Sequence, residues 1–124
     1  MIVYRYNTDK TKTLLFEDIA VADNFFAKLI GLTFKKNLNY GECLLIRGCS
    51  SIHTMWMRFN IDVLFLDISE KAAAGCLRIV ELIENMKAFS FSPIVPDSGD
   101  VLELKSGAIA RNNIKKGELL CFDL

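Results

Sequence analysis

Short apolar stretches separated by turn-forming residues run through most of the chain, a pattern typical of a mostly β protein. The most continuous stretch, Ile61–Ile68, is apolar on both faces of a strand apart from Asp62 and Asp67. A strand that is apolar on both faces is covered on both sides, so the sequence predicts a central strand here. Ile2–Tyr6 and Thr13–Glu17 flank the turn-forming NTDK and predict a hairpin.

The remaining elements complete a mostly β (α+β) single domain over residues 1–124. Strands are predicted at Cys43–Ile46 and in the C-terminal part, where VLEL, AIARN and ELLCF alternate with turns as a β-meander. Cys76–Glu84 fits a strand or a helix, and the short turn before it favours a strand antiparallel to Ile61–Ile68. One short amphipathic helix is predicted at Ala22–Ile30, near the N-terminus, because apolar residues recur there at helical spacing. Closure into a small barrel-like or rolled antiparallel sheet would remove the exposed strand edges.

Length and charge exclude several classes of protein. The 124 residues suffice for one core and are too few for two domains. Fifteen basic and fifteen acidic residues cancel, so no nucleic-acid partner is expected. No apolar run approaches the roughly 18 residues that a membrane helix needs, which predicts that there is no transmembrane segment. The polar start MIVYRYNTDK does not fit a signal peptide, so a cytoplasmic protein is expected.

The cysteines, at positions 43, 49, 76 and 121, contain no CxxC pair. Together with the expected cytoplasmic location, this predicts four free thiols. Cys49 and His53 have a C-x-x-x-H spacing, but a zinc site needs more ligands than these two. Neither a metal nor a cofactor is predicted.

The stretch Ile52–Phe59 is predicted to be a strand with two different faces. One face carries His53 among apolar side chains, and the other carries Thr54, Trp56 and Arg58. If the second face is exposed, Trp56 beside Arg58 forms an aromatic and guanidinium patch of the kind enriched at interaction sites. If it packs against the helix, Trp56 belongs to the core.

His53, Asp62 and Glu103 form a second candidate, a polar cluster near one rim of the sheet. Asp62 and Glu103 both lie inside apolar strands, so each carboxylate needs a partner or water. Such a cluster could bind an anion or a small polar ligand, could serve an enzyme that uses His53, or could satisfy itself. A Ser-His-Asp triad is not supported, because Ser51 and His53 are too far apart on a strand for a direct hydrogen bond and no G-x-S-x-G turn is present.

Several of these residues also carry a family resemblance. The order helix–GLT, then C-S-S-I-H-T-x-W-M-R-F-x-I-D-V-L-F-L-D, then VLELKSGAIA and a final I-x-x-G-E resembles the domain of unknown function 192 family, from about Ala22 to Leu120. Its most specific part is Ser51–Asp67, although Asn60 stands where many members carry proline. The resemblance implies a compact, mostly β fold with a short helix. It implies no activity, because the family has no established one.

Three function classes remain open. The leading hypothesis is a non-catalytic accessory or binding module whose protein partner or small polar ligand contacts the surface around Ile52–Asp62. The alternative is a small enzyme or polar-ligand binder that uses His53 with Asp62 or Glu103. The third is an oligomeric structural protein; a monomer or weak homodimer is expected. The candidate ligand or partner site comprises His53, Thr54, Trp56, Arg58, Asp62 and Glu103.

Overall fold

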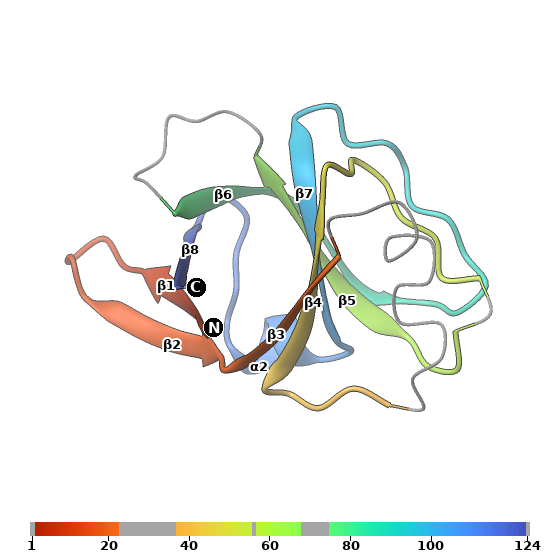
Figure 1. The fold of residues 1–124 in the computed structure, drawn as a ribbon, viewed down its shortest axis with the longest axis horizontal. Coiled ribbons are helices and arrows are strands. Elements are labelled where there is room, and N and C mark those ends of the chain that lie inside the picture. Colours follow the sequence, from red (N-terminus) through yellow and green to blue (C-terminus); the bar gives the residue numbers. More distant parts are fainter. Residues whose placement is uncertain (1, 23–36, 56, 68–74, 124) are drawn as a thin grey trace.

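Eight strands and one helix make up the described part of this computed structural model, which covers residues 2–22, 37–55, 57–67 and 75–123 (Figure 1). The strands form one mixed sheet in the order β2-β1-β8-β6-β5-β7-β4-β3. The predicted mostly β class is therefore confirmed. The elements are β1 Ile2–Tyr6, β2 Lys12–Phe16, β3 Asp18–Ala22, β4 Glu42–Arg47, β5 Ile61–Asp67, β6 Cys76–Met86, β7 Ser98–Lys105, α2 Ala108–Arg111 and β8 Leu119–Asp123.

The sheet is open, so the predicted closure into a barrel is wrong. Its two edge strands, β2 and β3, follow one another in the chain with only Glu17 between them. Although the chain runs directly from one edge strand into the other, β2 and β3 are at opposite ends of the strand order and are not paired with each other, so the sheet does not close. The expectation of a purely antiparallel sheet is also wrong, because β3 pairs in parallel with β4.

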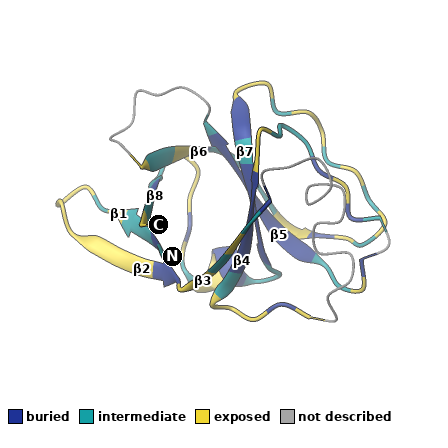
Figure 2. Ribbon diagram, in the orientation of Figure 1, coloured by how far each residue is buried: buried dark blue, intermediate teal, exposed yellow. Residues whose placement is uncertain are grey.

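β5 lies between β6 and β7, and every residue from Ile61 to Leu66 is buried (Figure 2). The predicted central strand is therefore confirmed. The antiparallel pairing of β5 with β6 and the hairpin of β1 and β2 are confirmed as well. β6 joins the two halves of the sheet, since its first residues pair with β8 and the rest of the strand pairs with β5.

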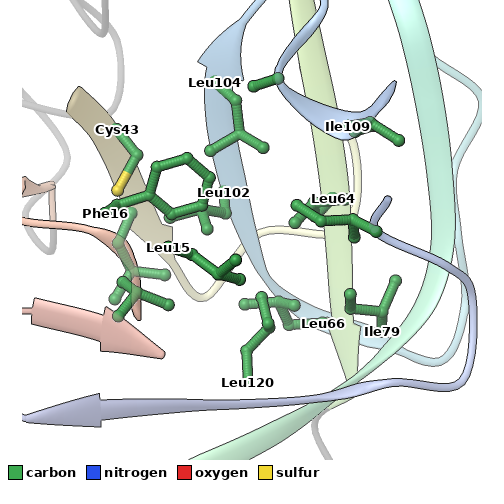
Figure 3. Packing of buried hydrophobic residues seen from close by; sticks show 14 residues of the cluster. Leu15, Phe16, Cys43, Leu64, Leu66, Ile79, Leu102, Leu104, Ile109 and Leu120 are labelled. Carbon is green, nitrogen blue, oxygen red and sulfur yellow. The ribbon is translucent and has the colours of Figure 1, made fainter. Parts of the chain in front are cut away.

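One hydrophobic core fills the space between the central strands and the layer of β1, β2 and β8 (Figure 3). Phe16 from β2 and Leu120 from β8 belong to the same buried cluster as Leu64 of β5 and Leu102 of β7. The helix α2 adds Ile109 to this cluster. Alternation along β5 and β7 thus directs one row of side chains into this core.

A second core covers the opposite face of the central strands. There Val63 and Phe65 of β5 and Val101 of β7 belong to one cluster with Ile52 and Met57. The covering residues come from irregular segments of the chain instead of strands. Ile52 and Met57 therefore lie across this face of the sheet.

Two predicted strands take other forms. The described residues of Ile52–Phe59 form an isolated bridge, between His53 and Phe91, instead of a strand. AIARN begins with α2 instead of a strand of a meander, because Asp62 accepts hydrogen bonds from the backbone N–H groups of Gly107 and Ile109 at the start of this helix. That partner lies 47 residues from Ile109, too far along the chain for a local pattern to show it.

The described helix, α2, lies near the C-terminus, and it is too short to cross a membrane. The helix predicted at Ala22–Ile30 falls on residues outside the described part of the chain, except for Ala22, which ends β3.

The prediction of four free thiols is wrong. Cys76 and Cys121 lie opposite each other in the pairing of β6 with β8 and form a disulfide. The other two cysteines, Cys43 and Cys49, are free. Burial raises the pKa of the Cys43 thiol to about 12, so this thiol stays protonated at neutral pH. With a disulfide present, the cysteines no longer argue for a reducing compartment.

Candidate functional site

The segment around His53 is held by a second irregular segment, residues 87–95. Backbone N–H groups of Phe89, Ser92 and Val95 donate to carbonyl groups of residues 54, 52 and 50, each with a nitrogen–oxygen distance of 2.9 Å. In return, Thr54 donates its backbone N–H to the carbonyl of Ser90 at 2.9 Å. These bonds fix the two segments against each other although neither is a strand.

Thr54 is fully buried and serves this arrangement with its side chain as well. Its hydroxyl donates to the carbonyl of Lys87 at 2.6 Å and accepts from the backbone N–H of Ser90 at 2.9 Å. The hydroxyl is thus used within the protein, and no part of Thr54 is exposed to a ligand. Its position supports a role in holding the 87–95 segment.

Three large apolar side chains on this segment face solvent. Phe89 is 56% exposed, and Phe91 and Ile94 are each 73% exposed. The exposed ring of His53 lies beside Phe91, and the two ring centroids are 6.2 Å apart. We call these four residues, His53, Phe89, Phe91 and Ile94, the aromatic surface.

The backbone of Phe89 is unusual, because its φ angle is 61°, in the left-handed region. An aromatic residue adopts this region rarely and at a cost in free energy. The hydrogen bond from its N–H to the Thr54 carbonyl helps to maintain the conformation. Strained residues of this kind are concentrated at functional sites.

The predicted patch of Trp56 and Arg58 is described only in part. Arg58 is exposed, as a partner-facing residue would be, whereas Trp56 lies outside the described residues.

Asp62 is fully buried and points from β5 toward α2. One carboxylate oxygen accepts from the backbone N–H of Asn85 at 2.7 Å. The other accepts from the N–H groups of Gly107 at 3.1 Å and Ile109 at 2.9 Å. The predicted need for a partner is therefore met by backbone N–H groups at the end of β6 and the start of α2.

Glu103 is also buried, but it faces the second core. Its pairing partner across the sheet, Val63, belongs to that core, whereas Leu104, the partner of Asp62, belongs to the first. Within the described part of the chain, its Oε2 atom has no hydrogen-bond partner. Burial raises the pKa of the Glu103 carboxyl to about 8, so this side chain is mostly protonated and neutral at pH 7.

The structure does not bring His53, Asp62 and Glu103 together. Asp62 and Glu103 point to opposite faces of the sheet, and His53 contacts Phe91 on the surface. Nor do the described residues contain a group of three or more His, Cys, Asp or Glu side chains that could hold a metal ion.

The aromatic surface contains three residues that sequence reasoning missed. Ile94 lies in SPIVPDSGD, which the sequence indicates only as a proline-flanked loop, and Phe89 and Phe91 come just before it. Two phenylalanines separated by a serine next to such a loop are a usable signal of an exposed aromatic surface, because a loop has no face that must be buried. The alternation of phenylalanine and serine does not by itself show which side chains are exposed.

Comparison with known proteins matches nearly the whole chain to one family. Residues 5–122 match the family called domain of unknown function 192, described as "Uncharacterized ACR". A UPF0127 protein from Thermococcus sibiricus is 29% identical over 106 residues, which are 81% of this chain. The matched part is only 62% of that relative, so the chain spans less than two thirds of the relative's length.

Two crystal structures have a similar fold. One is a protein of unknown function from Novosphingobium aromaticivorans, with a TM-score of 0.79 and 18% identity, covering 98% of this chain and 84% of the other. The second is a putative transcription regulator from Sinorhizobium meliloti, with a TM-score of 0.73 and 20% identity, covering 95% of this chain and 89% of the other. At these identities the likeness concerns the fold alone.

Proposed function

Since this chain belongs to the domain of unknown function 192 family, whose name carries no activity, we propose a function from the site itself: the protein is a binding module whose aromatic surface docks an apolar segment of a partner protein. One observation carries the proposal. Phe89, Phe91 and Ile94 are exposed on a segment that is hydrogen-bonded along its length to residues 50–54.

The ordered backbone that carries the aromatic surface supports binding. Because hydrogen bonds to residues 50–54 already fix this segment, little backbone entropy is lost when a partner covers it. Aromatic residues are enriched at interface centres because one ring buries a large area. The left-handed backbone at Phe89 is consistent with this function, since the fold maintains a strained residue at the surface.

The charges near the aromatic surface favour a protein partner over a membrane. The segments 49–60 and 87–97 carry Arg58 and Lys87, both exposed, and one exposed acidic residue, Asp97. Binding to anionic lipid typically uses clusters of about four to eight basic residues. The small excess of positive charge here is too weak for that role, whereas it does not oppose contact with an apolar protein segment.

Peptide selection tests the proposal. Peptides are selected from a random display library on the wild-type protein, and the affinity of a fluorescent selected peptide is measured by anisotropy. The double variant Phe91→Ser/Ile94→Ser removes two largely exposed apolar side chains. Burial of each contributes about 1–2 kcal/mol after allowance for its partial exposure, so at least a tenfold loss of affinity is expected.

Leu14→Ser is the matched control, because Leu14 is an apolar residue that is 50% exposed on β2, outside the aromatic surface. Its affinity for the peptide should match that of the wild type. Unchanged binding by the double variant would refute the proposal. Co-sedimentation with phosphatidylcholine–phosphatidylserine vesicles that depends on Phe91 would assign the surface to membranes instead, and a dimer in sedimentation velocity that depends on Phe91 would assign it to a second copy.

A further inference from the structure

A small polar pocket lies where the ends of β5, β6 and β7 come together, separate from the residues of the aromatic surface. Its volume is 240 Å³, and Phe59, Asn60, Asn85, Lys105 and Ser106 line it together with residues 37 and 38. Most of these side chains are polar, and among the described residues that line the pocket only Lys105 is charged.

The hydrogen bonds around Asn60 determine how the amides in this pocket are oriented. The backbone N–H of Ala88 donates to Asn60 at 3.1 Å, so that atom of Asn60 must be the amide oxygen. The Asn60 nitrogen then donates to Asn85 at 3.1 Å, and the hydroxyl of Ser106 donates to the same Asn85 atom at 2.7 Å. That atom is therefore the Asn85 oxygen, and the Asn85 amide nitrogen has no acceptor among the described residues.

Asp62 holds the backbone at two places beside this pocket. Its carboxylate accepts from the backbone N–H of Asn85 and from that of Gly107, which follows Ser106. Asn85 has a φ angle of 52°, at a point where the pairing of β5 with β6 is irregular. The bond to Asp62 thus fixes a backbone position that asparagine tolerates better than most residues.

Positive charge gathers beside the pocket. The Lys105 ammonium lies 5.2 Å from the centre of the Tyr40 ring, and the guanidinium carbon of Arg111 lies 4.3 Å from the centre of the same ring. Neither cation forms a salt bridge within the described part of the chain. Both oxygens of the Asp62 carboxylate already accept backbone N–H groups, from Asn85, Gly107 and Ile109.

From these observations we propose that the pocket is a binding site for the oxyanion group, a carboxylate or a phosphate, of a small ligand. The Asn85 amide nitrogen and the Lys105 ammonium are donors, and no carboxylate is among the described residues that line the space. Such donors bind anionic oxygens more strongly than neutral acceptors. The site is independent of the aromatic surface, so either can fail without the other.

The test is an NMR titration of the ¹⁵N-labelled protein with inorganic phosphate, with acetate and with neutral acetamide at constant ionic strength. We expect saturable shifts of the Asn60 and Asn85 side-chain amides with phosphate or acetate and none with acetamide. The stronger of the two anions identifies the ligand group. Shifts that spread over all exposed lysines without saturation would overturn the proposal.

Two variants and one control complete the experiment. Asn85→Asp keeps an oxygen for the Asn60 and Ser106 donors but replaces the free amide nitrogen with a charged oxygen, so anion binding should fall at least tenfold. Lys105→Gln should weaken binding to a similar degree. Lys12→Gln is the control, because the Lys12 ammonium also lies over a tyrosine ring, at 4.7 Å from the centre of Tyr4, and should retain wild-type affinity. Equal binding by all four proteins, each confirmed folded by its thermal melt, would refute the site.

Discussion

Replacing Asp62 by asparagine tests how the buried centre of the fold is held. The carboxylate accepts three backbone N–H groups, at 2.7, 3.1 and 2.9 Å, and it joins the end of β6 to the start of α2. An asparagine side chain has one oxygen and one NH₂ group. Whichever way its amide faces, at least one backbone N–H then meets another donor instead of an acceptor.

The magnitude follows from the bonds that are lost. Hydrogen bonds to a charged group contribute about 1.5–3 kcal/mol each, and an unpaired buried donor costs about 1–3 kcal/mol. If the amide oxygen takes the place of the oxygen that bonds Gly107 and Ile109, only the bond from Asn85 is lost. We therefore expect Asp62→Asn to lower the free energy of unfolding by about 2–4 kcal/mol, out of a total of about 5–15 kcal/mol for a typical domain.

Urea unfolding at pH 7, followed by circular dichroism, measures this loss. Asp97→Asn is the matched control, because Asp97 is exposed and should change the free energy of unfolding by less than about 0.5 kcal/mol. A loss below about 1 kcal/mol for Asp62→Asn, with an unchanged m-value, would show that the three bonds do not hold the fold as described.

Two further predictions concern Glu103 and the disulfide. The folded protein raises the pKa of Glu103 from 4.5 to about 8, so the folded state retains a proton that the unfolded chain releases. The free energy of unfolding should therefore fall as pH rises from about 4.5 to 8, by at most about 5 kcal/mol. Urea unfolding of Glu103→Gln over the same pH range should not show this fall. Parallel pH profiles for the wild type and the variant would contradict the prediction. Cys76 and Cys121 are 45 residues apart, so reduction of their disulfide should lower the free energy of unfolding by about 4 kcal/mol, as the lost chain-entropy constraint predicts. Labelling of four thiols in the unreduced, denatured protein would contradict the disulfide.

The central part of the fold could be predicted from the sequence because its pattern is local. Ile61–Ile68 is apolar on both faces, and such a run is stable only when both faces are covered. The same pattern predicted that Asp62 must have partners, since a buried carboxylate without them is too costly. The identity of those partners could not be predicted, because Gly107 and Ile109 reach Asp62 only through the folding of β7 and α2.

Other features depend on contacts that alternation does not encode. The alternating stretch Ile52–Phe59 fits a strand, yet it meets an irregular segment, and among its described residues only His53 forms a bridge. Cys76 and Cys121 look like separate apolar residues until β6 and β8 are paired. The aromatic surface was missed for a similar reason, since its exposure depends on how the 87–95 segment is hydrogen-bonded to its neighbour.

Mapping a bound peptide on the unmutated protein tests most directly whether the aromatic surface binds a partner. In a cross-saturation NMR experiment with a peptide selected on the wild-type protein, we expect the largest losses of signal intensity at His53, Phe89, Phe91 and Ile94. The described chain also exposes apolar side chains elsewhere, among them Tyr6 on β1 and Leu14 on β2. Effects centred on those two strands, with none at Phe91, would contradict the claim.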